Sequence, residues 1–133
     1  MAMSPVMENV KFDPTANIAP VVSLELRGIL RFRYTFDLIE DNQTGFAESW
    51  SGDNMIKNNR QDTFFLPFGD NRLNYAVLQW NFDLFPTADS GDYLINIYIK
   101  QSDKQIFSKQ YTGSIDKACA IPGSIIFKAT KKV

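Results

Sequence analysis

The 133-residue chain contains no histidine, one cysteine and no long hydrophobic run. Without histidine it lacks the commonest general base, the usual partner of a serine or cysteine nucleophile and the commonest metal ligand. A single cysteine, Cys119, excludes an intrachain disulfide, and its apolar neighbours are typical of a buried, inert thiol. No stretch approaches the roughly 18 apolar residues of a membrane-spanning helix, so none is expected.

Neither sign of charge is in excess, because the chain has 14 Lys and Arg and 15 Asp and Glu, for a net charge of −1. No global field would therefore attract nucleic acid, and the glycine patterns that bind phosphates or dinucleotides are missing, so we expect no cofactor. The first residues lack the basic and apolar segments of a signal peptide. This predicts a cytoplasmic location, with secretion as the alternative if a leader has been removed.

Several segments of the chain show a strict alternation of apolar and polar residues. Eight apolar residues share even parity near the start: Val22, Leu24, Leu26, Leu30, Phe32, Tyr34, Phe36 and Leu38. Similar runs at 76–84 and 93–99, with shorter apolar segments between turn residues, indicate about seven or eight strands. We therefore predict an all-β, antiparallel Greek-key sandwich, with a jelly roll or a C2-like arrangement as alternatives.

Two features bear on how the domain begins. Residues 1–20 hold three of the six prolines and no periodicity, so we expect an extended N-terminal arm and a single sandwich domain over 21–133. Gly28 then interrupts the first alternating run. A two-residue turn there would set Leu24 opposite Arg31, which breaks the facing rule. A three-residue loop between paired strands or a glycine bend within one strand both keep parity.

A corner motif follows the alternating run at 76–84. Three aromatic residues precede a spaced Asp-x-Gly-x-Tyr pattern: Trp80, Phe82, Phe85, Asp89, Gly91 and Tyr93. This spacing resembles the E–F region of immunoglobulin-like and fibronectin-like domains, although the family's cysteine pair is absent. The resemblance implies that Asp89 and Tyr93 fix the corner, with the Tyr93 hydroxyl bonded to nearby backbone, and that neither takes part in binding.

Candidate binding residues lie in or next to the polar stretch 51–62, which we expect to be a long loop, or on the polar parity of strands: Trp50, Asp53, Asn54, Asn58, Asn59, Arg60, Tyr75 and Tyr98. The sandwich class favours a non-enzymatic binding module that uses a sheet face, an edge strand or the 51–62 loop to bind another protein or its own copy. The alternative is a carbohydrate-binding module, with an exposed aromatic ring stacked on a sugar. Equally, Trp50 could close the core and the tyrosines cover a sheet edge.

Carboxylates are the remaining candidates for metal binding or catalysis. Asp53 and Asp62 are the calcium candidates because hard ions take oxygen ligands, but their spacing does not match an EF-hand and turn formation also explains them. A glycosidase needs only two carboxylates and so stays as a third class. We predict no catalytic residue and no metal.

Overall fold

The computed structural model describes residues 7–40, 46–53, 60–67, 72–88 and 90–130. These residues form nine strands and no helix, so no described helix is available to cross a membrane. The strands are β1 (Glu8–Phe12), β2 (Val21–Gly28), β3 (Leu30–Ile39), β4 (Phe46–Asp53), β5 (Arg60–Phe65), β6 (Val77–Pro86), β7 (Asp92–Gln101), β8 (Lys104–Ser114) and β9 (Cys119–Ala129). The predicted all-β class is confirmed.

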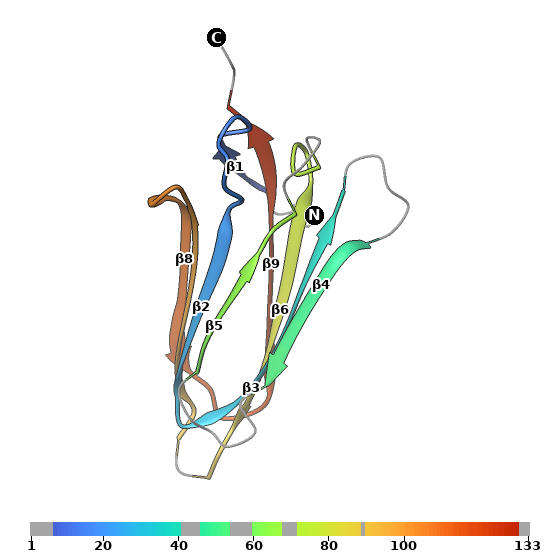
Figure 1. The fold of residues 1–133 in the computed structure, drawn as a ribbon. Coiled ribbons are helices and arrows are strands. Elements are labelled where there is room, and N and C mark those ends of the chain that lie inside the picture. The colour runs from blue at the N-terminus through green and yellow to red at the C-terminus, as the bar shows by residue number, and fades with distance from the viewer. Residues whose placement is uncertain (1–6, 41–45, 54–59, 68–71, 89, 131–133) are drawn as a thin grey trace.

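The strands build two sheets that face each other (Figure 1). The five-stranded sheet has the order β1-β9-β6-β3-β4, and the four-stranded sheet has the order β5-β2-β7-β8. Every pairing is antiparallel except that of β1 with β9, which is parallel. The sandwich is therefore established, while the Greek-key connection and the immunoglobulin-like resemblance stay predictions.

Alternation decides which side of each strand enters the core. All eight even-numbered apolar residues between 22 and 38 are buried, as the parity predicts. Register then sets Phe36 of β3 opposite Trp80 of β6, and the Phe36 ring also contacts Phe64 of the other sheet and Phe82. These rings meet at centroid distances of 5.4–5.8 Å, largely edge-on or tilted, as aromatic pairs prefer. An aromatic cluster thus joins the two sheets.

Gly28 lies where the chain leaves one sheet for the other. β2 belongs to the four-stranded sheet and β3 to the five-stranded sheet, so the two strands do not pair. Gly28 has a φ of 140°, and a Cβ there would lie 2.5 Å from the Asp92 carbonyl oxygen. The three-residue hairpin loop is therefore wrong. The chain bends at the glycine, as the other alternative expected, but the bend separates two strands of different sheets instead of lying within one strand.

The first twenty residues are not wholly an arm. Glu8–Phe12 forms β1 at one edge of the five-stranded sheet, with Val10 and Phe12 each 2% exposed. The strand is held by parallel pairing with β9, and the Thr130 amide donates to the Phe12 carbonyl at 2.8 Å. Only two of its residues point inward, which is too short a pattern to distinguish from a loop in sequence.

The corner between β6 and β7 carries the chain from one sheet back to the other. The Gly91 carbonyl accepts a hydrogen bond from the Ile115 amide at 3.0 Å, and a Cβ on Gly91 would lie 1.7 Å from the Ile115 carbonyl oxygen. Tyr93 lies opposite Gly113 on β8, against which its ring packs. Gly91 therefore has a structural role. Asp89 lies outside the described residues, so its role stays a prediction.

Candidate binding surface

The outer face of the four-stranded sheet brings polar side chains from all four strands into register. Gln61 of β5 pairs with Glu25 of β2, Glu25 pairs with Asn96 of β7, and Asn96 pairs with Gln110 of β8. These four residues form what we call the polar row. Because side chains directly opposite one another in adjacent strands are close neighbours, the row can form a continuous set of contacts across the sheet.

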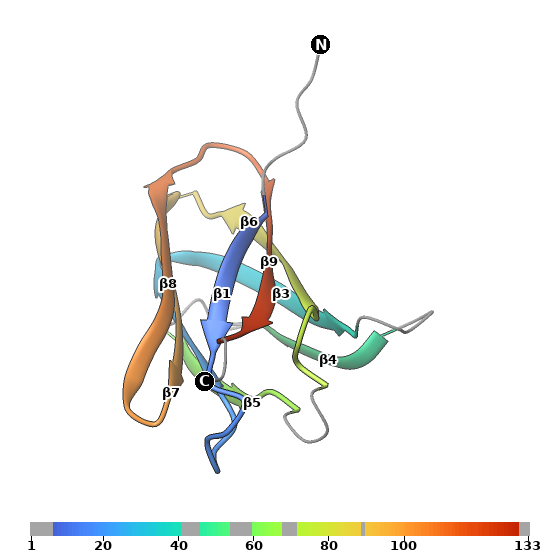
Figure 2. The same cartoon turned by 90° about the horizontal axis from the view of Figure 1, so that it is seen from above.

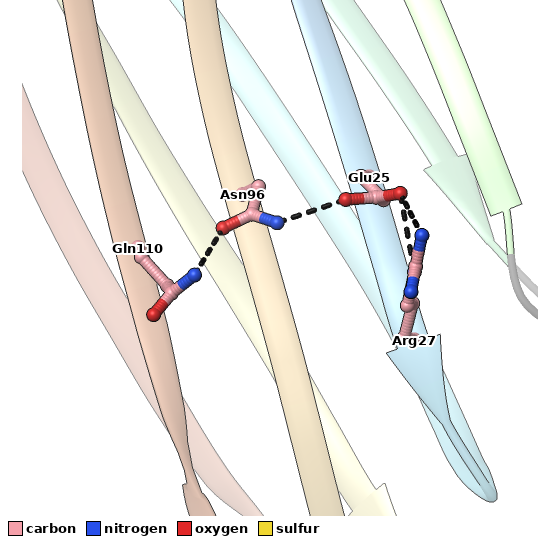
Figure 3. Close-up of polar contacts among 4 residues, drawn as sticks. All are labelled: Glu25, Arg27, Asn96 and Gln110. Carbon is pink, nitrogen blue, oxygen red and sulfur yellow. Dashed lines mark hydrogen bonds and ion pairs between the residues drawn. The ribbon is translucent and has the colours of Figure 1, made fainter.

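Hydrogen bonds link most of the polar row in one direction (Figure 3). The Gln110 amide donates to Asn96 Oδ1 at 2.9 Å, and Asn96 Nδ2 donates to Glu25 Oε1 at 2.8 Å. Arg27 closes the series, donating to Glu25 Oε2 from Nε at 3.1 Å and from Nη2 at 2.5 Å. Asn96 is only 6% exposed, so its amide group is held in place at the centre of the face.

Glu25 stays ionised in this setting. The hydrogen bond from Asn96, followed by that from Arg27, lowers the pKa of the Glu25 carboxyl. A carboxylate with a lowered pKa is a poor general acid near neutral pH. Glu25 is therefore a fixed, charged hydrogen-bond acceptor on this face.

Aromatic side chains flank the polar row on the same face. Tyr98 of β7 lies in the next row, beside Ser23 of β2 and opposite Ser108 of β8, and is half-buried. One row further, Phe65 of β5 pairs with Val21 and is 69% exposed, more than any other large hydrophobic residue that the structure describes. The face thus combines ordered polar groups with accessible aromatic surface.

Two shallow depressions, each of about 350 Å³, lie on this side of the sheet. One is lined by Ser23, Glu25, Gln61, Thr63 and Tyr98, among others. The second adjoins it through Glu25 and Gln61 and extends to Arg27 and Arg60. The polar row therefore lines recesses that a ligand could enter.

Trp50 packs against the core. It pairs with Phe36 across β3 and β4, and its ring stacks on Phe64 of the facing sheet with centroids 4.4 Å apart and planes 19° from parallel. Trp50 is therefore partly buried and its stacking partner belongs to the domain itself, which supports the interpretation that it closes the core. Of the two predicted tyrosines, Tyr98 lies on the outer face described above. Tyr75 is 50% exposed but lies before β6, where its amide donates to the Phe127 carbonyl at 2.7 Å.

Arg60 and Asp62 point between the sheets. Arg60 Nε donates to both Asp62 oxygens at 2.8 and 3.0 Å, and the Tyr34 hydroxyl of the facing sheet donates to Asp62 Oδ2. Arg60 Nη1 also donates to the Asp53 carbonyl at the end of β4. Burial, together with the hydrogen bond to Asp62, raises the pKa of the Tyr34 hydroxyl, which keeps it a donor. These residues tie the margins of the two sheets together.

The calcium candidates face positive charge. Asp62 is occupied by Arg60 and Tyr34, and Asp53 Oδ2 lies 3.3 Å from Arg31 Nη2, while Asp53 Oδ1 is buried with no partner in the described structure. Guanidinium groups next to both carboxylates disfavour a bound cation. Within the part of the chain that the structure describes, no three His, Cys, Asp or Glu residues are grouped to hold a metal. Asn54, Asn58 and Asn59 lie outside it.

Sequence reasoning identified Tyr98 but missed the rest of this face: Glu25, Gln61, Phe65, Asn96 and Gln110. Each lies on the outward parity of its strand, yet that signal alone does not distinguish a binding residue from a solvated one. Only the register between strands distant in sequence shows that they form one surface.

No family model, curated protein or solved structure matches this chain. The fold therefore defines its class by itself. It is a β-sandwich with a core closed by aromatic residues and a polar outer face on its four-stranded sheet.

Proposed function

We propose that this domain acts by binding rather than by catalysis, and that its binding surface is the outer face of the four-stranded sheet. The observation that carries the proposal is Phe65, whose large apolar ring is 69% exposed on that face, two rows from the ordered polar row. Accessible aromatic groups among satisfied polar groups are characteristic of protein interfaces. The occupant we propose is a protein surface, and in the first instance a second copy of this chain.

The sheet face is a better binding surface than the sheet edges. β5 and β8 are the two edges of the four-stranded sheet, and each directs charge inward: Arg60 and Asp62 on β5, and Lys109 on β8. Inward-pointing charge on an edge strand is a device that opposes the addition of a further strand. A partner is therefore expected to lie across the strands.

The charges on this face suit association with a second copy. Glu25 and its partner Arg27 lie on it, as does Lys100 opposite Val21, so two copies related by a twofold axis can set opposite charges against each other. Four strands about 4.8 Å apart and eight residues rising about 3.3 Å each give a footprint on the order of 500 Å² per copy. This is below the roughly 800 Å² of a standard interface, so the proposed dimer is weak and concentration-dependent.

The carboxylates support binding over hydrolysis. A glycosidase needs one acid with a raised pKa and one free carboxylate across a cleft. Here Asp62 bonds Arg60 and Tyr34, Asp53 faces Arg31, and Glu25 has a lowered pKa. Each of these three carboxylates is engaged with a cation or a hydrogen-bond donor of the domain itself.

Phe65→Glu is expected to abolish self-association. A charge in place of the exposed ring removes the apolar contact and repels its symmetry mate, while leaving the core untouched. Light scattering over a concentration series should show the mass of the unmodified protein rising towards that of a dimer, and the variant staying monomeric. The matched control is Ile29→Glu, because Ile29 is also a highly exposed hydrophobic residue, 59% exposed, but lies where the chain crosses between sheets. A Phe65→Glu variant that associates like Ile29→Glu would contradict the proposal.

A carbohydrate is the second candidate occupant, and the position of Tyr98 favours it. The half-buried Tyr98 ring borders a depression of about 350 Å³ that also contains Ser23, Glu25 and Gln61. An aromatic ring next to hydroxyl, carboxylate and amide groups suits stacking on a sugar and hydrogen bonding to its hydroxyls.

Tyr98→Ser is expected to weaken any binding to soluble oligosaccharides by about tenfold, since an aromatic contact is worth on the order of 1 kcal/mol beyond its buried area. Titration calorimetry with neutral hexasaccharides of β- and α-linked glucose, xylose and mannose measures this directly. Tyr75→Ser serves as the control because Tyr75 is exposed away from the face. An unmodified protein that binds none of the sugars, or equal losses in the two variants, would overturn this candidate.

A further inference from the structure

A separate cavity of about 450 Å³ opens at the margin between the two sheets, near β8 and β9. Trp80, Phe107, Tyr111 and Ile125 provide much of its lining, and Lys109 and Glu8 are charged residues that also line it. Figure 2 shows β1 between β8 and β9 at this margin of the sandwich. The cavity is distinct from the outer face of the four-stranded sheet, and nothing in the proposed function uses it.

Register explains why aromatic groups gather there. Phe107, Lys109 and Tyr111 lie opposite Ile99, Ile97 and Ile95, so all three have the inward parity of edge strand β8. On the facing sheet Trp80 of β6 is opposite Gly123 of β9. Trp80 and Phe107 are each 5% exposed and Tyr111 is half-buried, so these aromatic residues form the floor of the cavity and Tyr111 is the most accessible of them.

Gly123 lets the Trp80 indole occupy this position. A Cβ at residue 123 would lie 2.3 Å from Trp80 Nε1, so any other residue there would displace the ring. The indole N–H donates to the Tyr111 hydroxyl at 3.3 Å across the gap between the sheets. The Phe107 ring lies 6.2 Å from Trp80, between centroids, which completes an aromatic wall.

Among the described residues, the pairing of β1 with β9 begins at Glu8 and Ile125. Pro122 and Gly123 of β9, which pair with β6 on their other side, line the cavity. The cavity is therefore bordered by backbone of β9 as well as by side chains.

We propose that this cavity binds a small planar aromatic anion. Its volume lies within the roughly 300–1,000 Å³ of known ligand pockets, and the half-buried Tyr111, with the small exposed parts of Trp80 and Phe107, offers aromatic surface to a planar ring. Lys109 supplies the charge: its Nζ is 5.6 Å from the centroid of the Tyr111 ring, at the mouth of the cavity, where it can pair with a carboxylate or sulfonate.

Lys109 could also be explained as an inward charge that protects the β8 edge. Edge protection, however, requires neither the open aromatic cavity nor the space that Gly123 leaves for the indole. Glu8 also lines this cavity, and its negative charge would repel an anion. Removing that charge should therefore strengthen anion binding, which edge protection does not predict.

The probe is 8-anilinonaphthalene-1-sulfonate, an aromatic anion with a planar naphthalene ring. The chain has two tryptophans, so a Trp50→Phe background, which keeps an aromatic ring on Phe64, leaves Trp80 as the sole energy-transfer donor when tryptophan is excited selectively. Near-ultraviolet circular dichroism and cooperative urea unfolding first establish that each variant is folded. We expect saturable binding of one probe per chain, with energy transfer from Trp80.

Lys109→Met is expected to weaken binding at least about fivefold through loss of a charge-assisted contact, whereas Lys117→Met, at an exposed lysine between β8 and β9, leaves it unchanged. Tyr111→Ala is expected to reduce binding as well, and Glu8→Gln to tighten it. The neutral probe N-phenyl-1-naphthylamine should bind more weakly and be insensitive to Lys109→Met. The proposal is overturned by absence of saturable binding to the folded protein, by equal effects of Lys109→Met and Lys117→Met, or by weaker binding in Glu8→Gln.

Discussion

Gly91→Ala is expected to destabilise the domain by about 3 kcal/mol or more, as inserting a methyl group against fixed backbone does at the severe end of overpacking. The added Cβ would lie 1.7 Å from the Ile115 carbonyl oxygen, and backbone cannot rotate away as a side chain can. Relieving the clash also strains the hydrogen bond from the Ile115 amide to the Gly91 carbonyl. Urea unfolding followed by circular dichroism measures the loss.

Gly113→Ala is the matched control. The Cβ added there would lie 3.0 Å from the Tyr93 hydroxyl oxygen, at the far end of a side chain that can shift. We therefore expect a loss of less than about 1 kcal/mol. If the two substitutions cost the same, the corner does not hold Gly91 against Ile115 as described.

Phe36→Ala is the second large effect, with an expected loss of about 3–5 kcal/mol in the free energy of unfolding. The Phe36 ring is fully buried, and it contacts Phe64, Trp80 and Phe82, so its removal leaves a cavity between the sheets. Since domains of this size are stable by only about 5–15 kcal/mol, the variant should unfold at a much lower urea concentration.

Phe65→Ala provides the comparison with the same chemical change at the surface. Phe65 is on the outer face and 69% exposed, so its truncation should alter the free energy of unfolding by no more than about 0.5 kcal/mol. A loss at Phe65 as large as that at Phe36 would mean that the Phe65 ring is packed against the domain, and would remove the basis for the proposed binding surface.

Much of the fold could be predicted because alternation is a local signal. Between residues 22 and 38, the parity of each apolar residue predicts whether its side chain points into the core. The same parity also excluded a tight turn at Gly28. The choice between hairpin and bend could not be made from sequence, since it depends on which sheet β3 joins. That is decided by pairing with β6, some fifty residues away.

Short strands and mixed parity limited the prediction elsewhere. Only Val10 and Phe12 indicate which side of β1 is buried, and its partner β9 lies more than a hundred residues later in the chain. Trp50 had two interpretations, binding platform or core, and only the facing sheet, through Phe64, distinguishes them.

The binding surface was the least predictable feature for the same reason. Asn96, Glu25 and Gln110 are unremarkable polar residues in three separate alternating runs. Their hydrogen bonds span 71 and 14 residues of sequence, and they become one surface only when β2, β7 and β8 are placed side by side. Phe65 is an apolar residue on the outward parity of β5, which is a sign of a binding surface. The strand is too short, however, for its alternation to show from sequence alone that Phe65 points outward.

The most direct test of the account is to map the surface at which copies meet. Amide resonances of ¹⁵N-labelled protein, followed by NMR over a dilution series, report which residues change environment on association. We predict concentration-dependent shifts that cluster at Ser23, Phe65 and Tyr98 and disappear in Phe65→Glu. Shifts that cluster instead on the outer face of the five-stranded sheet, around Thr35 and Asn81, would contradict the assignment of the binding surface.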